Sequence, residues 1–347
     1  MEKYQVALCS FGMSGKVFHA PFLQVHPGLN FYAVWERAKN LATEIYPGVK
    51  TFRSFEEMLA DKTIDLVIIN TPSYTHFDFT KKVLLADKHA VVEKPFTATT
   101  SQAEELISLA KKVNKKLSVY QNRRYDSDYK TVKKILDEEL LGKIVDAEIH
   151  YDRFNPQLSP KEHKEIPGPA VGCLYDLGSH LIDQAIQFFG MPLAVSADIT
   201  INRPGSLADD YFDLKLFYPE HRMTLKSSYF VREPLPGYIF HGRKGSFIKA
   251  KTDVQEINLT AGKLPEGDDW GKEPATEMGF LHTEKDGIII KKHIPSLQGN
   301  YMEYYNGIYE ALANNSAMPV TAADGLKVIR LIEAAMKSNK ERKVIDL

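Results

Sequence analysis

The feature that most constrains the fold is an alternation of short apolar runs with helix-length segments along the first third of the chain. One run, Ile64–Ile69, is almost continuously apolar, as expected for a strand that is buried on both faces of a parallel sheet. Strands that alternate with helices of this length predict a doubly wound parallel sheet. The expected strands are Tyr4–Cys9, Phe31–Trp35, Lys50–Phe52, Ile64–Ile69, His89–Val92 and Leu117–Tyr120, and the expected helices are Gly15–Val25, Tyr74–Ala86 and Ser101–Val113.

The first expected strand leads into a loop that is close to the dinucleotide-binding fingerprint. In that fingerprint, glycines permit a tight turn and let backbone N–H groups approach a pyrophosphate at a helix N-terminus. Gly12 and Gly15 take the second and third glycine positions, and Ser10 replaces the first. A degenerate glycine pattern is weak evidence alone, but this one follows a strand and opens a helix, as the motif requires. The cofactor-binding residues expected here are Ser10, Phe11, Gly12, Met13, Ser14 and Gly15.

The second expected strand ends at Glu36 and Arg37, and these two residues bear on the choice of cofactor. Glu36 lies roughly 20 residues after the last glycine, where a carboxylate would accept hydrogen bonds from the adenosine ribose. Arg37 could instead pair with a 2′-phosphate, which Glu36 would repel. The cofactor is therefore expected to be NAD or NADP, with a slight preference for NAD.

Polar side chains follow the later strands of the expected sheet at the point where each strand ends. Ligands of doubly wound sheets bind beyond the carboxyl ends of the strands, so this clustering indicates a site. His76 is equally consistent with polarity at the start of a helix and with lining a nicotinamide site. Arg123 to Asp126 could form an ion network between domains or bind substrate hydroxyls. The residues in question are Asn70, Thr71, Pro72 and His76, then Glu93, Lys94 and Pro95, then Asn122, Arg123, Arg124, Tyr125 and Asp126.

A second cluster lies on a helix that is expected to begin within Val171–Gln184. Apolar residues recur there at helical spacing, and Asp176 and His180 stand four residues apart on the other side. Residues four apart share one face of a helix, where a carboxylate beside an imidazole can hold a proton acceptor near neutral pH. Taken alone, the pair is more simply explained as a solvated polar stripe or an ordinary helix ion pair.

From Lys143 onward, the pattern changes to alternating apolar and polar residues, which is typical of half-buried strands. Strands without intervening helices predict a mainly antiparallel open sheet. We therefore expect an α/β dinucleotide-binding Rossmann domain at residues 1–122 and an α+β substrate-binding and oligomerisation domain at residues 123–347, with the last helix packing back on the first domain. The expected strands include Leu193–Ile201, Tyr211–Tyr218, Met223–Phe230, Gly237–His241 and Gly287–His293, and the expected helices are Lys130–Glu139, Asn300–Ala313 and Ala322–Ser338.

Composition narrows the class of protein and its partners. At 347 residues the chain is long enough for two domains, and 44% hydrophobic with 26% charged residues is ordinary for a globular protein. A net charge of −1 gives no electrostatic reason to bind nucleic acid or an anionic membrane. Cys9 and Cys173 form no disulfide framework, and the sequence shows no secretory signal or membrane-length apolar run, so the expected compartment is the cytoplasm.

Two motifs, Glu93-Lys94-Pro95 and Asp176-Leu177-Gly178-Ser179-His180, make the chain strongly resemble the Gfo/Idh/MocA family of NAD(P)-dependent oxidoreductases. The resemblance extends nearly from end to end, because SFGMSGKVFHAPFL, NTPSYTH, VVEKPFT, NRRYDSD, LYDLGSHLIDQ and MPVTA occur in the family's order. In its motifs, the chain is most similar to the subgroup that contains NADP-dependent scyllo-inositol dehydrogenases. The resemblance implies hydride transfer between nicotinamide and a secondary alcohol of a sugar, cyclitol or other polyol.

The resemblance also implies roles for single residues. Lys94 would contact the substrate hydroxyl, with Asp176 and His180 beside it and the histidine as the acid or base. Glu93 would contact the nicotinamide-side ribose, and Pro95 would help to set the turn that aims Lys94, with a cis Lys94–Pro95 bond possible. Ser10 and the Glu36–Arg37 pair depart from the family's pattern and leave NAD versus NADP open. The residues expected to bind substrate are Arg124, Tyr151, Arg153 and Tyr175.

Two other functions fit parts of the pattern. A non-catalytic NAD(P)-binding sugar sensor shares the fold, but a sensor does not need Lys94, Asp176 and His180 together. Metal-assisted chemistry would need more ligands than Asp176 and His180, and no His/Cys cluster supplies them, so no metal is expected. An open antiparallel sheet needs cover for its exposed face, and the family pairs such sheets, so we expect a homodimer or homotetramer through the C-terminal sheet.

Overall fold

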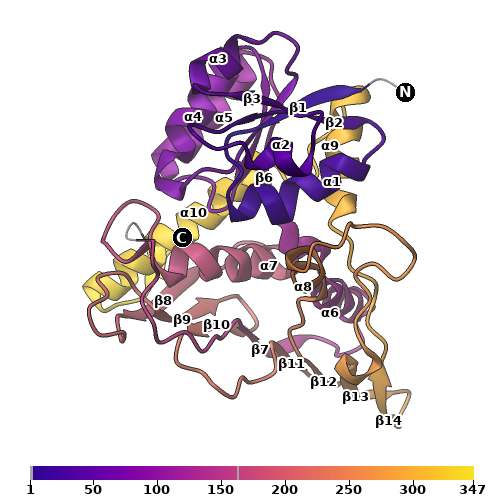
Figure 1. Cartoon of the computed structure of the whole chain (residues 1–347). Coiled ribbons are helices and arrows are strands. Elements are labelled where there is room, and N and C mark those ends of the chain that lie inside the picture. The colour runs from indigo at the N-terminus through magenta and orange to yellow at the C-terminus, as the bar shows by residue number, and fades with distance from the viewer. Residues whose placement is uncertain (1–2, 162–163) are drawn as a thin grey trace. The chain divides into compact units, whose positions relative to one another are not determined.

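The computed structural model describes residues 3–161 and 164–347, which form two compact units. The first unit runs to Asn122 and also contains Val254–Trp270 and Asn300–Leu326. The second contains Arg123–Asp253, Gly271–Gly299 and Lys327–Leu347. After first leaving the first unit, the chain therefore returns to it twice; most elements of both units are labelled in Figure 1.

A six-stranded parallel sheet forms the centre of the first unit. Its strand order is β3-β2-β1-β4-β5-β6, so the order reverses between β1 and β4, where doubly wound sheets bind nucleotides. Every residue of β4 is buried, as expected from its apolar run. The strands are β1 (Tyr4–Leu8), β2 (Leu29–Trp35), β3 (Lys50–Phe52), β4 (Leu66–Ile69), β5 (His89–Glu93) and β6 (Leu117–Tyr120).

Short helices connect the strands of this sheet, and local sequence explains where several of them begin. Ser54 and Glu57 form a reciprocal capping box at the start of α3, in which each side chain accepts the backbone N–H of the other residue. One π-helical turn, Gly15–His19, follows the glycine-rich loop and leads into α1. The connecting helices are α1 (Ala20–Val25), α2 (Leu41–Ile45), α3 (Phe55–Ala60), α4 (His76–Leu85) and α5 (Thr100–Lys112), and later segments of the chain add α8 (Val254–Thr260) and α9 (Met302–Ala313) to the unit.

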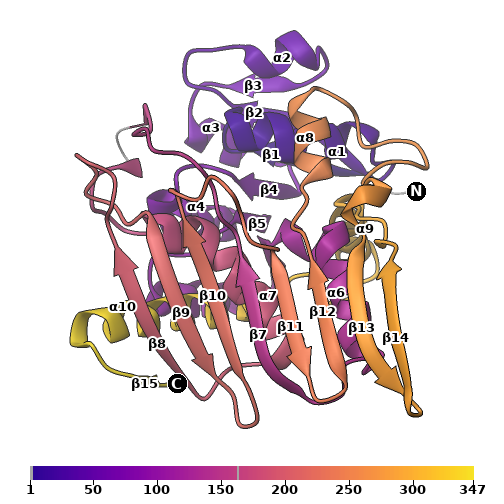
Figure 2. The same cartoon turned by 90° about the horizontal axis from the view of Figure 1, so that it is seen from below.

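A nine-stranded sheet, seen in Figure 2, dominates the second unit. Its order is β14-β13-β12-β11-β7-β10-β9-β8-β15, and its neighbours are antiparallel except for β7 and β10. The strands are β7 (Ile144–His150), β8 (Ala194–Thr200), β9 (Tyr211–Phe217), β10 (Arg222–Ser228), β11 (Tyr238–Gly242), β12 (Gly245–Lys249), β13 (Gly279–Lys285), β14 (Ile288–Ile294) and β15 (Ile345–Asp346).

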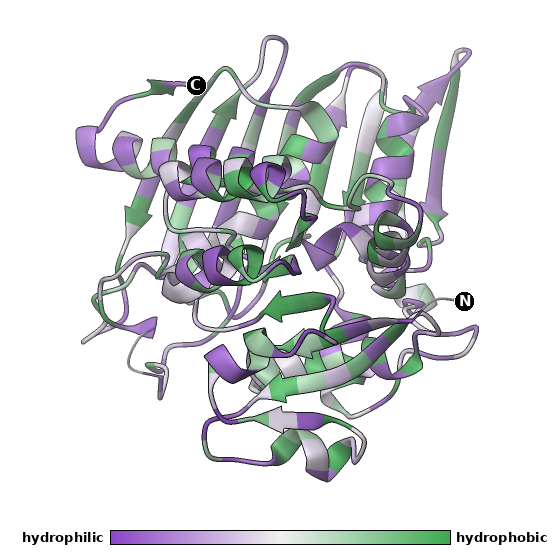
Figure 3. Cartoon of the chain, turned by 90° about the horizontal axis from the view of Figure 1, so that it is seen from above, coloured by the Kyte–Doolittle hydropathy of each residue, from purple (hydrophilic) through white to green (hydrophobic). Residues whose placement is uncertain are grey.

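Helices α6 (Ser127–Asp137) and α7 (Ser179–Phe189) lie along one face of the nine-stranded sheet (Figures 1 and 2). Alternate strand residues such as Ile149, Leu214 and Leu225 are fully buried, and the residues between them point to the opposite face. Figure 3 shows this alternation of hydrophobic and hydrophilic residues along the strands. The sequence-based fold class, a Rossmann sheet followed by a mainly antiparallel open sheet with helices, is therefore confirmed.

Helix α10 (Ala322–Glu341) begins in the first unit and continues into the second. Near its end, Ser338 and Asn339 accept hydrogen bonds from the backbone N–H groups of Ala197 and Ile199 on β8, each at 3.0 Å. In the part of the chain that the structure describes, no helix combines the length and the apolarity that crossing a membrane requires.

Among the described residues, the elements not expected from the sequence include α2, β12, β13, β15 and α8. The strands β12 and β13 contain few apolar residues, and their place is decided by pairing with β11, with each other and with β14. The residue pattern of one strand does not reveal such pairing, because the neighbouring strands supply the hydrogen bonds. The short α8 is held by Gln255, whose side-chain oxygen accepts the Trp270 indole N–H and the Tyr301 backbone N–H.

Candidate active site

The glycine-rich loop of the first unit has the shape that a dinucleotide pyrophosphate needs. A Cβ atom at Gly12 would meet only the Ser10 hydroxyl oxygen, at 3.9 Å, so the backbone there is not crowded. A Cβ atom at Gly15 would lie 2.4 Å from the carbonyl oxygen of Ser10, so only glycine allows this close approach. These are the two tasks of the later glycines in the fingerprint, backbone access and tight packing. Gly12 and Gly15 therefore fit the binding of a dinucleotide cofactor.

Asn70, at the end of β4, fastens this loop. Its side-chain oxygen accepts the backbone N–H of Ser10 at 2.9 Å, and its amide nitrogen donates to the Ser10 carbonyl oxygen at 2.8 Å. The Ser10 hydroxyl donates in turn to the Asn70 carbonyl oxygen at 2.9 Å. The serine that replaces the first glycine thus bridges the ends of β1 and β4, the strands between which the sheet order reverses.

The remaining expected residues of the loop differ in exposure. Phe11 is buried and stacks on Phe31, so only its backbone is available to a ligand. Met13 is largely exposed, and the Ser14 hydroxyl donates a hydrogen bond to Glu93. Asn122 is buried at the start of a 3₁₀ turn, Asn122–Tyr125, beyond β6.

Glu93 and Lys94 stand where β5 ends. Glu93 is buried, and its Oε2 accepts the backbone N–H of Lys94 at 3.2 Å. The Lys94–Pro95 peptide bond is cis, a form that the sequence left possible. Because Ser14 bonds to Glu93 as well, the glycine-rich loop and the Lys94 loop are joined directly.

His76 is buried beside the same loops. Its Nδ1 lies 2.8 Å from the carbonyl oxygen of Pro95, and its Nε2 lies 3.0 Å from that of Thr71. Burial lowers the pKa of His76, so the neutral ring has one N–H and donates it to only one of these two carbonyl oxygens at a time. The His76 ring therefore lies between the loop after β4 and the loop after β5, and its place in a nicotinamide site stays a prediction.

Glu36 turns inward at the end of β2. Its carboxylate accepts the backbone N–H groups of Leu41 at 3.2 Å and Ala42 at 3.1 Å, so it satisfies the first turn of α2. Arg37 is exposed, and Arg53 donates to backbone carbonyl oxygens of the same loop, including that of Glu36. The Glu36 carboxylate is therefore occupied, and the loop presents cationic side chains.

In the second unit, Asp176 and His180 lie at the start of α7. The segment Leu174–Gly178 is one π-helical turn, and the α-helix begins only at Ser179. A π turn holds more residues than an α turn, so the four-residue spacing does not correspond to the regular α-helical stacking that the sequence suggested. The side chain of Asp176 is 41% exposed, whereas His180 is 5% exposed.

A buried carboxylate positions the beginning of this helix. Asp209 Oδ2 accepts the backbone N–H of Leu174 at 2.8 Å, and the Asp209 carbonyl oxygen accepts that of Cys173 at 2.8 Å. Burial raises the pKa of Asp209 to about 6. Gly172 has a φ of +104°, and a Cβ atom there would lie 1.8 Å from Asp209 Oδ1, so this approach requires glycine.

The segment before α7 brings a lysine to Asp176. The Nζ of Lys164 lies 3.9 Å from Asp176 Oδ2. The adjacent Glu165 is buried and accepts from Arg203 at 2.9 Å, and Arg203 also pairs with Asp210. Lys164 is thus placed beside the expected catalytic carboxylate by a buried ion network.

Three of the residues expected to bind substrate have defined neighbours in the second unit. Arg124 forms a two-point ion pair with Asp183 on α7. The guanidinium of Arg153 lies 5.2 Å from the ring centre of Tyr151 and donates to its hydroxyl at 3.3 Å. Tyr175 is buried on the π turn, and burial raises its pKa to about 12.

An ion network surrounds the strand-end residues that follow β6. Arg123 pairs with both Asp126 and Asp253, and Lys251 lies 3.5 Å from Asp128. Burial raises the pKa of Asp126 to about 7, although Arg123 opposes the shift. Of the two interpretations that the sequence left open for Arg123 and Asp126, these contacts favour the ion network, and it lies within the second unit.

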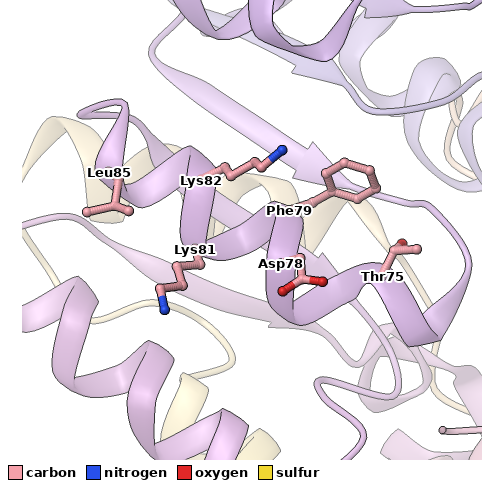
Figure 4. A pocket seen from close by; sticks show the side chains of 6 residues that line it. All are labelled: Thr75, Asp78, Phe79, Lys81, Lys82 and Leu85. Atoms are coloured by element: carbon pink, nitrogen blue, oxygen red, sulfur yellow. The ribbon is translucent and has the colours of Figure 1, made fainter.

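The pocket in Figure 4 belongs to another part of the first unit. It is lined by α4 and the residue before it, and Lys81 and Lys82 are paired with Glu105 and Glu56. We assign it no role in the site. Its lining residues are Thr75, Asp78, Phe79, Lys81, Lys82 and Leu85. Across the described ranges, no group of three or more His, Cys, Asp or Glu side chains is placed to hold a metal ion.

The sequence-based reasoning missed several residues that contact the expected site residues. Asp183 carried a signal, since it follows His180 by three residues on the same helical face. His19 and Asp209 carried none, because their partners are remote in the chain: His19 contacts Glu93, 74 residues away, and Asp209 caps a segment 35 residues before it.

Both parts of the chain match models of one protein family. Residues 4–121 match the NAD-binding Rossmann fold of the Gfo/Idh/MocA oxidoreductase family, and residues 133–347 match the C-terminal α/β domain of the same family. Together the two models account for most of the described chain.

Single proteins similar to the chain agree with these matches. The scyllo-inositol 2-dehydrogenase (NADP(+)) of Bacillus subtilis is 39% identical over 350 residues, which covers 100% of this chain and 97% of the relative. The crystal structure of a putative oxidoreductase from Bacteroides fragilis has a TM-score of 0.91 and 46% identity and covers 100% of both chains. The putative oxidoreductase YvaA of Bacillus subtilis has a TM-score of 0.95 and 38% identity and covers 100% of this chain and 99% of that one.

Proposed function

Because the chain belongs to the Gfo/Idh/MocA oxidoreductase family, we propose that it transfers hydride between a nicotinamide dinucleotide and a secondary alcohol of a sugar, cyclitol or other polyol. The observation that carries the proposal is the bond between Ser14 and Glu93, which joins a dinucleotide-binding loop to the loop of Lys94. The scyllo-inositol 2-dehydrogenase of Bacillus subtilis supports a polyol as the substrate class.

In this proposal, Lys94 and His180 act on the same hydroxyl group of the substrate. The Nζ ammonium of Lys94 stabilises the negative charge that develops on the reacting oxygen. A ring nitrogen of His180 accepts the proton from that oxygen, a step that typically contributes about 10²–10⁴-fold. Asp176, whose carboxylate is partly exposed, orients His180 or accepts a substrate hydroxyl. When bound, the nicotinamide supplies the redox chemistry by accepting or donating the hydride.

Four residues of the second unit complete the proposed substrate contacts: Arg124, Tyr151, Arg153 and Tyr175. Hydroxyl groups of a polyol can accept from guanidinium groups and exchange hydrogen bonds with phenols. The Arg153–Tyr151 pair and the Arg124–Asp183 pair hold two of these guanidinium groups in fixed positions.

The test of the proposal is a screen of polyols with NAD and NADP in parallel, followed by Lys94→Ala on the best pair. Turnover should fall by at least about 10²-fold, since the reacting oxygen loses its cation. Lys81→Ala is the matched control, because Lys81 forms an exposed ion pair on α4 with Glu105. Near-full turnover of Lys94→Ala would make the assignment wrong. Turnover unchanged by a chelator is expected, and loss of turnover would favour metal-assisted chemistry.

We also propose that NADP is the preferred cofactor. The Glu36 carboxylate, which would repel a 2′-phosphate, is turned away and engaged by the N–H groups of Leu41 and Ala42. Arg37 is exposed on the same loop and can pair with that phosphate. The slight preference for NAD that the sequence suggested depended on a Glu36 carboxylate facing the ribose.

The change Arg37→Ala tests this preference. A charge-assisted hydrogen bond contributes about 1.5–3 kcal/mol, so KM for NADP should rise roughly 10- to 150-fold while KM for NAD changes little. Lys39→Ala, two residues away on the same exposed loop, is the matched control. Equal effects of Arg37→Ala on both cofactors would contradict the proposal.

For the assembled state we propose a homodimer or homotetramer through the open face of the nine-stranded sheet. On that face Ile239, Ile248 and Phe280 stand in one cross-strand row over β11, β12 and β13. Phe280 is exposed, and an apolar row of this kind is suited to burial against a second copy. Light scattering after size exclusion should give a mass above the 39.3 kDa of one chain, and Ile248→Glu should lower it.

A reducing compartment, as in the cytoplasm, is consistent with the thiols. Cys9 and Cys173 are both free and buried, and burial raises the pKa of each. Free thiols are typical of proteins in reducing compartments, where disulfides rarely form.

A further inference from the structure

Within the first unit, a buried chain of hydrogen bonds runs from the glycine-rich loop to α9. The Ser14 hydroxyl donates to Glu93 Oε1, and His19 Nε2 lies 3.0 Å from the same oxygen. His19 Nδ1 lies 2.9 Å from the hydroxyl of Tyr305. His19 is 0% exposed and stands on the π turn that follows the glycine-rich loop. None of the roles assigned above involves His19 or Tyr305.

The direction of each bond in this chain follows from the number of hydrogens available. Tyr305 has one hydroxyl hydrogen, and it is donated at 2.6 Å to the carbonyl oxygen of Phe18, which can only accept. The Tyr305 oxygen is therefore an acceptor toward His19, and His19 Nδ1 must carry a hydrogen. The Phe18 carbonyl oxygen also accepts from Tyr120 at 3.0 Å, which uses its second lone pair.

The other ring nitrogen of His19 faces the carboxylate of Glu93. Burial alone would raise the pKa of Glu93, but the hydrogen bond and charge of His19, followed by Ser14 and Lys94, lower it, so Glu93 is ionised. An ionised carboxylate only accepts, so His19 Nε2 donates to it. The His19 ring thus bridges the Tyr305 hydroxyl and the Glu93 carboxylate inside the unit.

Glu93 joins the branches of this hydrogen-bond network. Its Oε1 accepts from Ser14 and His19, and its Oε2 accepts the backbone N–H of Lys94. One carboxylate thus holds the glycine-rich loop and the backbone of Lys94 at once. A buried carboxylate whose oxygens are held by fixed donors keeps its partners in place, whereas one that has lost a donor would be free to rotate.

We propose that His19, supported by Tyr305, is a positioning residue that holds Glu93 and thereby fixes both the backbone of Lys94 and the glycine-rich loop. The inference rests on the proposed function for the importance of Lys94, but the contacts themselves do not depend on it. It gives Glu93 a role in holding the site together.

The first test measures the unliganded protein. In hydrogen exchange followed by mass spectrometry, the peptide that contains the Lys94 amide should exchange faster in His19→Phe than in wild type. His19→Gln should restore much of the protection, because its side-chain amide can still donate toward Glu93. A loss of global stability alone would not be rescued by glutamine in this one peptide.

The second test uses cofactor binding and turnover. NADPH fluorescence should show roughly 10- to 100-fold weaker binding in His19→Phe, since a charge-assisted bond to the loop anchor is lost. For a polyol identified by the screen, kcat should fall more than the substrate KM changes, because the backbone of Lys94 is displaced. Tyr305→Phe should show smaller losses of the same kind, since only the support of His19 is removed.

His26→Phe is the matched control. His26 is also a buried imidazole of the first unit, but its Nδ1 accepts from Gly28 and Leu29 and does not contact Glu93. It should lower the melting temperature without changing NADPH affinity or the exchange of the Lys94 peptide.

The outcomes separate this inference from the proposed function. If His19→Phe keeps wild-type exchange, NADPH affinity and kcat while Lys94→Ala is inactive, the inference is wrong and the proposed function stands. If Lys94→Ala is fully active, the proposed function fails whatever His19 does. If His19→Phe fails to fold, the test uses His19→Gln and Tyr305→Phe. The inference is wrong if both variants keep the wild-type hydrogen exchange of the Lys94 peptide and the wild-type affinity for NADPH.

Discussion

Replacing Arg124 by methionine should strongly destabilise the second unit. Arg124 Nε and Nη2 donate to the two carboxylate oxygens of Asp183 at 2.7 and 2.6 Å. The side chains are only 10% and 3% exposed, so water cannot replace the guanidinium once it is gone. Methionine retains the apolar stem and removes the charge, which leaves the Asp183 carboxylate buried beside an apolar group.

The expected magnitude follows from that burial. Removing one partner of a buried ion pair costs about 3–5 kcal/mol, chiefly because the other charge is left without its counter-ion. That cost corresponds to a factor of roughly 10² to 10⁴ in the unfolding equilibrium. At about 2–4 °C per kcal/mol for a unit of this size, the melting temperature should fall by roughly 6–20 °C.

A double-mutant cycle is the assay. Urea unfolding followed by circular dichroism should give a large loss for Arg124→Met and for Asp183→Leu, and a much smaller loss for the pair, since the double variant buries no lone charge. The reasoning is refuted if Arg124→Met costs less than about 1 kcal/mol, or if the two single losses simply add. A pure substrate-binding role for Arg124 would instead change KM and leave unfolding unaltered.

Three further predictions concern single positions. Burial raises the pKa of Asp126 to about 7, so the stability that its protonated form provides is complete below about pH 4 and is lost as the pH rises through about 7. The melting temperature should therefore fall between about pH 5 and pH 8. The fall should be smaller in Asp126→Asn, which cannot ionise at this position. Gly172→Ala should lower both turnover and melting temperature, because its Cβ would lie 1.8 Å from Asp209 Oδ1, and Asp209→Ala in the same background should recover part of the loss if that contact is the cause. Ser54→Ala should cost about 1 kcal/mol of unfolding free energy by removing the capping box of α3 and leave kcat unchanged, and a large change in kcat would mean that α3 influences the site.

The arrangement of the nucleotide-binding half illustrates which features local sequence can predict. Apolar runs such as β4 are strands because they must be buried on both faces, and polar residues collect where those strands end. The capping box at Ser54 and the close approach at Gly15 are equally local. Such features depend on the conformational preferences and burial of a few adjacent residues, so they can be predicted without knowing which distant segments pack against them.

Side-chain partners are a different matter, and Glu36 shows why. From its position it could face the ribose of a cofactor, but in the structure its carboxylate binds the N–H groups at the start of α2. Both outcomes are compatible with the same spacing, because the choice is made by rotation of one side chain. Arg124 shows the same limit, because its position in the sequence could not reveal that Asp183 holds its guanidinium.

The sequence by itself determined the class of sheet in each half, the dinucleotide-binding loop and the two motifs that carry the proposed chemistry. Only the tertiary structure decided which side chains hold them, because the partners come from distant segments: His19 meets Tyr305 across 286 residues, and β12 and β13 are strands through their pairing. A hydrogen bond has no signature in the spacing of residues along the chain unless both partners are near neighbours. Periodicity reports burial, whereas a buried hydrogen bond such as His19–Glu93 depends on where two remote backbones come together.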